Sequence, residues 1–281
     1  MIDAHHHMWK YSASEYAWIS DAMPGLRRNY LLPELRRVLG ASEVTGTIAV
    51  QARQTIEETE WLLQLAGPHS PVIGVVGWIS LVDPVAKAYL ERLAENPRLR
   101  GVRHVLQGEA DDLYMLRDDF NRGVDLLHGF GLAYDILIYE RHLPQTMDFV
   151  DRHPNQVFVL DHLGKPRIRE GVISPWLENI RELAKRENVY CKVSGMLTEA
   201  DWTNWTLDSL RPYFEAVLAS FTPKRLMFGS DWPVVNLAGG HKKWTATLRS
   251  MTEELTPEEQ ESIFRQSAIS AYKLQETSVI I

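Results

Sequence analysis

The 281-residue sequence predicts an α/β protein that folds as a (β/α)8 TIM barrel, with residues 1–281 forming a single domain. Two observations favour this class. Short apolar runs rich in β-branched residues alternate with longer amphipathic stretches along the whole chain, in about eight strand–helix units. No Pro/Ser-rich linker divides them. A doubly wound open sheet is the alternative, but it would need a glycine-rich phosphate turn, and neither GxGxxG nor GxxxxGK[ST] occurs.

The predicted strands are short runs of aliphatic and β-branched residues that end at charged or turn-forming residues. We expect them at residues 2–7, 46–51, 72–79, 101–106, 132–138, 157–161, 189–193 and 226–229. Because parallel strands joined by helices are buried on both faces, such continuous apolar runs are typical of a barrel.

The segments between the strands are predicted to be helices. We expect these at residues 33–39, 55–66, 84–94, 118–128, 143–152, 176–186, 207–219, 240–251 and 257–272. Pro33 suits a first helical turn, and Thr55 followed by Glu58 is a capping-box pattern. Two connections, residues 10–32 and 163–175, are long and lack periodicity, which is typical of functional lids.

Composition excludes several classes of protein. The formal net charge of −7 argues against a broad nucleic-acid-binding surface, which would need clustered positive charge. No apolar run reaches the ~18 residues of a membrane-spanning helix, so no membrane partner is expected. Cys191 is the only cysteine, which excludes an intrachain disulfide and fits a reducing compartment. Without a basic stretch followed by an apolar one at the start, we expect a cytoplasmic protein.

The start of the chain indicates a metal site. His5 and His7 lie two residues apart in the first predicted strand, so both imidazoles face the same side. Two imidazoles that converge on one point can supply two ligands of a divalent-metal site. A tag remnant is the alternative, but three histidines are too few, and apolar Ile2 before them indicates a strand that enters a core.

Polar side chains also mark the carboxyl ends of the other predicted strands. They are Gln51, Arg103, His104, Asp135, Asp161, His162, Lys192, Ser194, Glu199 and Asp231. Burying such groups unpaired would cost several kcal/mol each, so we expect them to converge on a metal, a substrate or one another. Adjacent residues on a strand point to opposite faces, so only one of Asp161 and His162 can point into the barrel, and the same holds for Arg103 and His104. We assign His162 and Arg103 to the site.

Five sequence strings carry a family resemblance. They are IDAHHH at residues 2–7, GVRHVLQ at 101–107, LDHLGKP at 160–166, CKVSG at 191–195 and FGSDWP at 228–233. With the His-x-His pair, His162 and Asp231 in barrel order, the chain resembles the amidohydrolase superfamily. Within it the chain is similar to the amidohydrolase-2 group of L-fuconolactonase and L-rhamnono-lactonase type enzymes. The resemblance spans residues 2–272.

The resemblance implies roles for individual residues. A Zn²⁺-type ion would be held by His5, His7 and Asp231 and would lower the pKa of a bound water to ~7. Asp231, His162 and Arg103 would be catalytic, as proton acceptor, water or carbonyl partner and oxyanion partner. The expected substrate contacts are Gln51, His104, Asp135, Lys165, Glu199, Trp78 and Trp232.

The chain departs from the two-metal pattern of the superfamily. The fourth predicted strand offers Arg103, a permanent cation that cannot ligate a metal, where the pattern has a bridging Lys or Glu. We therefore expect one divalent ion, Zn²⁺ by preference, and a metal-free reaction with Asp231 as the base stays open.

The expected function is hydrolysis of a small-molecule lactone of a sugar acid, such as L-fucono- or L-rhamnono-lactone, to the aldonate. A related enzyme acting on an aromatic-derived substrate, as a muconolactone-type hydrolase or a decarboxylase, is the runner-up. A non-catalytic carbohydrate-binding barrel is the alternative of another class. The apolar end at residues 279–281 leaves a homo-oligomer open.

Overall fold

The computed structural model describes residues 1–40 and 42–275, so the apolar end at residues 279–281 lies outside the described residues. One eight-stranded parallel sheet runs in the order β1 to β8, and each strand pairs with the next along the chain. The strands are β1 Ile2–His6, β2 Gly46–Val50, β3 Val72–Gly77, β4 Leu99–His104, β5 Ala133–Ile136, β6 Phe158–Leu160, β7 Val189–Val193 and β8 Leu226–Phe228. The predicted (β/α)8 barrel is confirmed.

The barrel closes between its first and last strands. His7 donates its backbone N–H to the carbonyl of Trp232 at 2.6 Å, and Asp231 donates to the carbonyl of His5 at 2.8 Å. These two bonds join the end of β1 and the residue after it to the segment that follows β8. Closure therefore brings residues 5–7 beside residues 231–232, although the two segments stand at opposite ends of the sequence.

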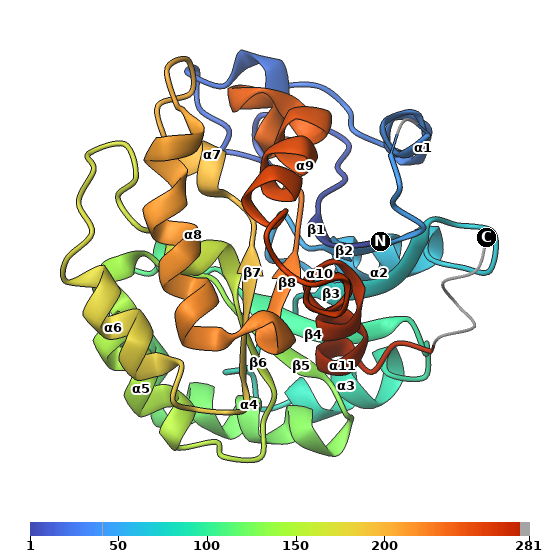
Figure 1. Ribbon diagram of the computed structural model, residues 1–281. Coiled ribbons are helices and arrows are strands. Elements are labelled where there is room, and N and C mark those ends of the chain that lie inside the picture. Colours follow the sequence, from blue (N-terminus) through green and yellow to red (C-terminus); the bar gives the residue numbers. More distant parts are fainter. Residues whose placement is uncertain (41, 276–281) are drawn as a thin grey trace.

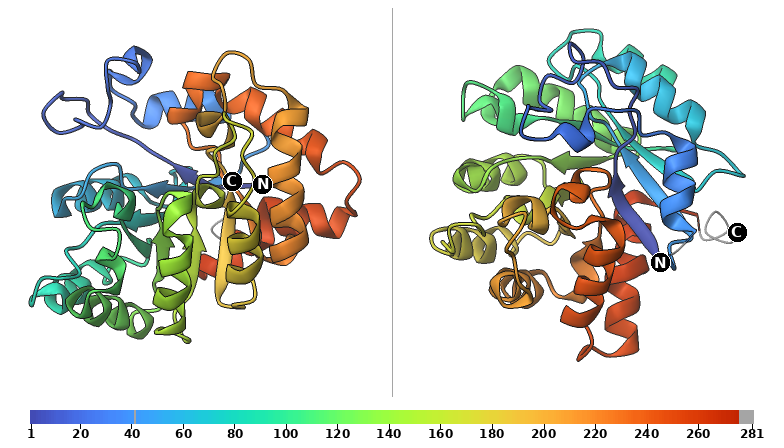
Figure 2. Two further views of the ribbon diagram at one scale, coloured as in Figure 1. Left: turned by 90° about the vertical axis from the view of Figure 1, so that its left-hand side faces the viewer. Right: turned by 90° about the horizontal axis from the view of Figure 1, so that it is seen from above.

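Helices surround the strands, as Figure 1 and Figure 2 show. They are α1 Leu32–Leu39, α2 Ile56–Leu65, α3 Ala86–Leu93, α4 Asp118–Gly129, α5 Leu143–Asp151, α6 Trp176–Leu183, α7 Met196–Glu199, α8 Leu207–Phe221, α9 Gly240–Met251, α10 Pro257–Glu261 and α11 Ser267–Tyr272. Two differ from expectation. The short α7 was not predicted, and a π-helical segment, Ser262–Gln266, separates α10 from α11 within the single helix expected at 257–272.

The start of α2 shows how local chemistry shapes the loops. The Thr55 side chain accepts the Glu58 backbone N–H at 3.2 Å, as expected for a helix N-cap. The Glu58 carboxylate does not complete a capping box but accepts backbone N–H bonds from Ala52 and Arg53 at 2.8 Å each. It also accepts the Tyr16 hydroxyl at 3.1 Å, which ties the long β1–α1 connection to this turn.

The apolar core has two parts. The larger one fills the space between strands and helices, while a second cluster contains alternate strand residues such as Ile2, Ile48 and Met227 together with residues of α11. Tyr272 of α11 belongs to this second cluster and is 1% exposed. In the described part of the chain, no helix combines the length and apolar character needed to cross a bilayer.

Candidate active site

The first and last strands bring three predicted side chains together. The Nε2 atoms of His5 and His7 lie 3.1 Å apart. Asp231 Oδ1 lies 3.4 Å from His7 Nε2 and 3.8 Å from His5 Nε2. All three residues are buried, with no more than 5% of any of them exposed.

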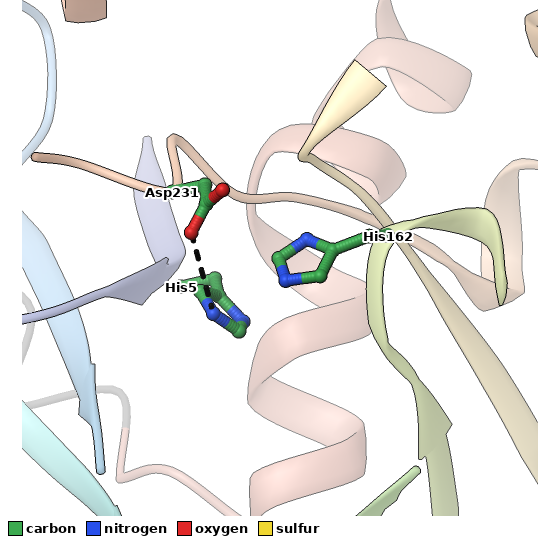
Figure 3. A group of neighbouring side chains, drawn as sticks. All are labelled: His5, His162 and Asp231. Carbon is green, nitrogen blue, oxygen red and sulfur yellow. Dashed lines mark ion pairs between the residues drawn. The ribbon is translucent and has the colours of Figure 1, made fainter. Parts of the chain in front are cut away.

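His162, which lies just after β6, completes this group. His5, His162 and Asp231 each offer a potential metal-binding atom, and these three atoms lie within 4.8 Å of one another. Figure 3 shows the three side chains pointing toward a shared space. The sequence prediction that early imidazoles and a late carboxylate meet at one point therefore agrees with the geometry.

Unusual backbone conformations aim two of these groups. His162 has φ 54° and Asp231 has φ 57°, both in the left-handed region that non-glycine residues rarely occupy. Such strain is found where the surrounding structure requires a particular side-chain direction. At His162 the left-handed turn begins just after β6 ends at Leu160, so strand alternation no longer applies there.

Gly195 makes room for the His162 ring. A Cβ atom at Gly195 would lie 2.7 Å from both Cγ and Nδ1 of His162, and Gly195 itself has φ +66°. The neighbouring Ser194 hydroxyl bonds His162 Nδ1 at 2.8 Å. The turn after β7 thus fixes the ring by close contact and by one hydrogen bond.

We expect Gly195→Ala to displace the His162 ring and to lower kcat/KM about 100-fold, because a small misplacement of a reacting group has this effect. The measurement is steady-state kinetics with a thermal melt of the same preparation. Gly171→Ala is the matched control, because it has φ +65° but no atom within 4 Å of its Cβ position. Equal losses in the two variants would contradict a specific role for the space at Gly195.

The site is electrically unusual because burial disfavours the charged form of two of its histidines, His5 and His162. Burial lowers the pKa of His162 to about 4. Burial, followed by the Lys192 charge, holds the pKa of His5 well below its ordinary value. Burial opposes ionisation of Asp231, but His162, His7 and Lys165 outweigh it and lower the pKa of this carboxyl group. At neutral pH the site therefore combines the Asp231 carboxylate with the neutral imidazoles of His5 and His162.

The donor set fits a divalent ion. His7 Nδ1 donates to the Val50 carbonyl at 2.8 Å, which leaves the Nε2 lone pair facing the site. Tetrahedral Zn²⁺ with bonds of about 2.0–2.1 Å places its ligand atoms about 3.4 Å apart. The separations among His5, His7 and Asp231 are 3.1, 3.4 and 3.8 Å, which match that requirement.

A buried ion network lies beneath these groups. Arg103 Nη1 donates to Asp161 Oδ2 at 2.9 Å, and Arg103 Nη2 donates to the Gln51 carbonyl at 2.5 Å. Lys192 Nζ forms ion pairs with Asp135 at 2.5 Å and Asp161 at 2.9 Å. We call Arg103, Asp135, Asp161 and Lys192 the interior network. The positive charges of its two cations equal the negative charges of its two carboxylates.

An open cavity of about 400 Å³ lies above the site. Its wall contains six residues predicted from the sequence: His7, Arg103, His162, Lys165, Glu199 and Asp231. Lys165 Nζ lies 3.4 Å from Glu199 Oε1, so these two form a polar pair on the wall. Burial is the main cause that raises the pKa of Glu199.

Five predicted substrate contacts are not among the cavity-lining residues of the described chain. His104 follows Arg103 on β4 and therefore faces the other way, where it bonds Glu109 at 2.6 Å and accepts the Trp78 indole N–H at 3.2 Å. These partners give Trp78 and His104 a role outside the cavity.

The other three contact neighbouring protein groups and do not line the cavity. Gln51 donates its side-chain amide to the Arg103 carbonyl at 3.3 Å, and Asp135 belongs to the interior network. Trp232 packs edge-on against Tyr30 and is 2% exposed. These residues bond or pack against neighbouring protein groups, and their contact with a substrate stays a prediction.

Several wall residues were not predicted individually. Trp18 and Met23 come from the long β1–α1 connection, Tyr139 follows β5, and Trp202 follows α7. The length of residues 10–32 was the only sequence signal, and it indicated a lid without naming its side chains. Trp18 is held by a bond from its indole N–H to the Ala52 carbonyl at 3.0 Å.

Comparison with known proteins places these features in a family. A family model described as amidohydrolase matches residues 2–274. A protein of Burkholderia multivorans named L-fucono-1,5-lactonase is 39% identical over 98% of this chain and 96% of its own length. A second protein of that name, from Burkholderia ambifaria, is 35% identical over 99% of this chain and 97% of its own.

A solved structure agrees with the sequence comparison. The crystal structure of an amidohydrolase from Burkholderia multivorans with bound zinc superimposes with a TM-score of 0.93 at 39% identity, and covers 98% of this chain and 99% of that one. The match of nearly the whole chain in sequence and in fold leads to one conclusion: this protein belongs to the amidohydrolase family.

Proposed function

We propose that this protein is a lactonase that opens the ring of a sugar-acid lactone to the aldonate, with L-fucono-1,5-lactone as the first substrate to test. One observation carries the proposal: an ionised, buried Asp231 faces the cavity beside neutral His162 and the Arg103 guanidinium. Ring opening needs a proton acceptor for water and a positive group for the carbonyl oxygen. The two L-fucono-1,5-lactonases of related sequence support the choice of substrate.

Asp231 acts as the general base. Its lowered pKa keeps the carboxylate ionised at neutral pH, so it can accept the proton of an attacking water. The same proton then passes to the ring oxygen as that oxygen leaves. Because proton gain and loss occur at one carboxylate, no second acid is needed to complete the cycle.

His162 and Arg103 position and stabilise the reacting atoms. Neutral His162 is held through Nδ1 by Ser194, which leaves Nε2 to orient the water or the carbonyl group. Arg103 lines the cavity and is fixed by Asp161 and the Gln51 carbonyl, so it presents a preorganised positive charge to the developing oxyanion.

A divalent ion, Zn²⁺ by preference, would be held by His5, His7 and Asp231, with His162 adjacent. When bound, it would supply Lewis-acid polarisation of the carbonyl group and lower the pKa of water. The remaining wall would bind the sugar: Lys165 and Glu199 are suited to its hydroxyl groups.

The test is a lactone panel followed with a pH indicator, because hydrolysis releases acid. Metal-stripped protein and protein loaded with Zn²⁺ or Mn²⁺ are compared on L-fucono-, L-rhamnono- and muconolactone-type substrates. Acid release with a sugar lactone supports the proposal. CO₂ release from an aromatic acid would favour a decarboxylase, and tight sugar binding without turnover would favour a non-catalytic barrel.

The pH profile supplies an independent check on the metal-stripped protein. Because the pKa of His162 is lowered to about 4, the ring stays neutral as pH falls through 6.5 and becomes charged only near pH 4. We therefore expect kcat/KM to stay level from about pH 8 to pH 5 and to fall near pH 4. An acidic limb close to pH 6.5 would contradict a neutral, buried His162.

We expect the reaction to take place in a reducing compartment such as the cytoplasm. Cys191 is buried and unpaired, which such a compartment allows.

A further inference from the structure

The reaction described above leaves Lys192 without a role. Its side chain is fully buried on β7 and does not line the cavity, so it cannot touch a substrate there. Its ammonium group nevertheless lies 3.0 Å from Nδ1 of His5, on the side of the ring opposite the site. A cation behind a metal-binding imidazole is unexpected, because that position normally holds a carboxylate or a carbonyl.

Two groups compete for Nδ1 of His5. Lys192 Nζ lies at 3.0 Å and can only donate a hydrogen bond. Asp161 Oδ1 lies at 3.4 Å and can only accept one. Because a neutral imidazole carries a single proton, the group that engages Nδ1 decides which nitrogen holds that proton.

When Lys192 donates to Nδ1, the proton of His5 sits on Nε2. Nε2 then donates to His7 Nε2 at 3.1 Å, whose lone pair is free because His7 Nδ1 bonds Val50. This arrangement satisfies both rings without a metal ion. It uses the two shortest contacts of the His5 ring nitrogens, while Arg103 Nη1 is farther from Nε2, at 3.5 Å.

When His5 instead donates from Nδ1 to Asp161, Nε2 presents a lone pair to the site. The lone pairs of His5 and His7 then face each other, which is favourable only with a cation between them. The structure also contains an acceptor for the Nδ1 proton in this second arrangement. Asp161 Oδ1 is fully buried and lies 3.4 Å from His5 Nδ1, so it can accept the ring N–H in addition to its ion pair with Lys192 Nζ at 2.9 Å.

We propose that Lys192 and Asp161 together set the metal affinity of the site by deciding which nitrogen of His5 carries the proton. Lys192 is a positioning residue that favours the metal-free arrangement, and Asp161 favours the metal-holding one. Because the proposal concerns the proton on His5, it does not depend on which substrate the enzyme uses.

The interior network keeps Lys192 in place. Asp135 bonds its ammonium at 2.5 Å and in turn accepts the Tyr272 hydroxyl at 2.8 and 2.9 Å. A contact chain therefore runs from α11 through Asp135 and Lys192 to His5. Removing Lys192 and one carboxylate together leaves the network balanced in charge.

The first test compares the Zn²⁺ and Co²⁺ affinities of the wild type and of Lys192→Met/Asp135→Asn by competition with a chelator. We expect the double variant to bind both ions at least tenfold more tightly, because Nδ1 of His5 is then free to donate to Asp161. Asp161→Asn should change affinity in the opposite direction, by about 10–100-fold, as loss of such a partner does.

Lys185→Met, an exposed lysine, is the control and should leave metal affinity unchanged. Circular dichroism and thermal melts establish that each variant is folded. An unchanged or weaker affinity in the folded double variant would overturn the proposal.

A second measurement uses the wild type alone and needs no variant to fold. In ¹⁵N-histidine-labelled protein, the two ring-nitrogen shifts of His5 report which nitrogen carries the proton; the His5→Gln spectrum identifies them. We expect Nε2–H in the metal-free protein and Nδ1–H after Zn²⁺ is added. Nδ1–H in the metal-free protein would overturn the proposal.

Discussion

Asp231→Asn is expected to lower kcat/KM for lactone hydrolysis about 10²–10⁴-fold, the range for loss of a positioned general base. Asparagine has nearly the same shape as aspartate, so the packing around residue 231 should change little. The asparagine side chain has no free carboxylate to take the proton of water. The loss should therefore appear in kcat, with a smaller change in KM.

The measurement is steady-state kinetics on L-fucono-1,5-lactone, with a thermal melt to verify folding. Asp208→Asn, at an exposed position on α8, is the matched control and should retain full activity. Asp231 is not the base if the variant keeps more than a tenth of the wild-type rate. Full activity of Asp231→Asn together with tight sugar binding would also contradict the assignment of this cavity as the active site.

Arg103→Met should reduce both stability and activity. Arg103 is 3% exposed, and its loss deprives Asp161 of a partner at 2.9 Å. Breaking a buried pair from one side costs about 3–5 kcal/mol, and we expect the lower end because Lys192 still faces Asp161. Loss of an oxyanion partner should also lower kcat about 10²–10³-fold.

A second variant separates the two effects. In Arg103→Met/Asp161→Asn the carboxylate that lost its partner is also neutral, so much of the stability should return while the activity should not. Chemical denaturation measures the first quantity and initial rates measure the second. A double variant that regains activity along with stability would show that Arg103 acts only through folding.

The identity of the barrel was accessible from the sequence because its signals are local. Apolar runs such as Val72–Gly77 and caps such as Thr55 depend on neighbouring residues alone. The convergence of His5, His7 and Asp231 was also predictable, since all eight parallel strands of a barrel direct their carboxyl ends to one face. The split of the helix at 257–272 was missed because its pattern continues unbroken through the π-helical segment.

Strand alternation failed where a strand had already ended. Asp161 and His162 were expected to face opposite ways, but β6 stops at Leu160 and the chain turns left-handed. Both side chains therefore reach the interior, Asp161 toward Lys192 and His162 toward Asp231. Arg103 and His104 do obey alternation, because they lie within β4.

The sequence by itself determined the barrel, the order of its strands and the kinds of side chain that meet at its mouth, since these follow from local patterns and from the symmetry of parallel strands. Only the tertiary structure decided the cavity wall, the interior network and the hydrogen bonds of each histidine. These depend on distances of a few tenths of an ångström between residues such as His5 and Lys192, which lie 187 positions apart in the chain and meet only after the barrel has closed.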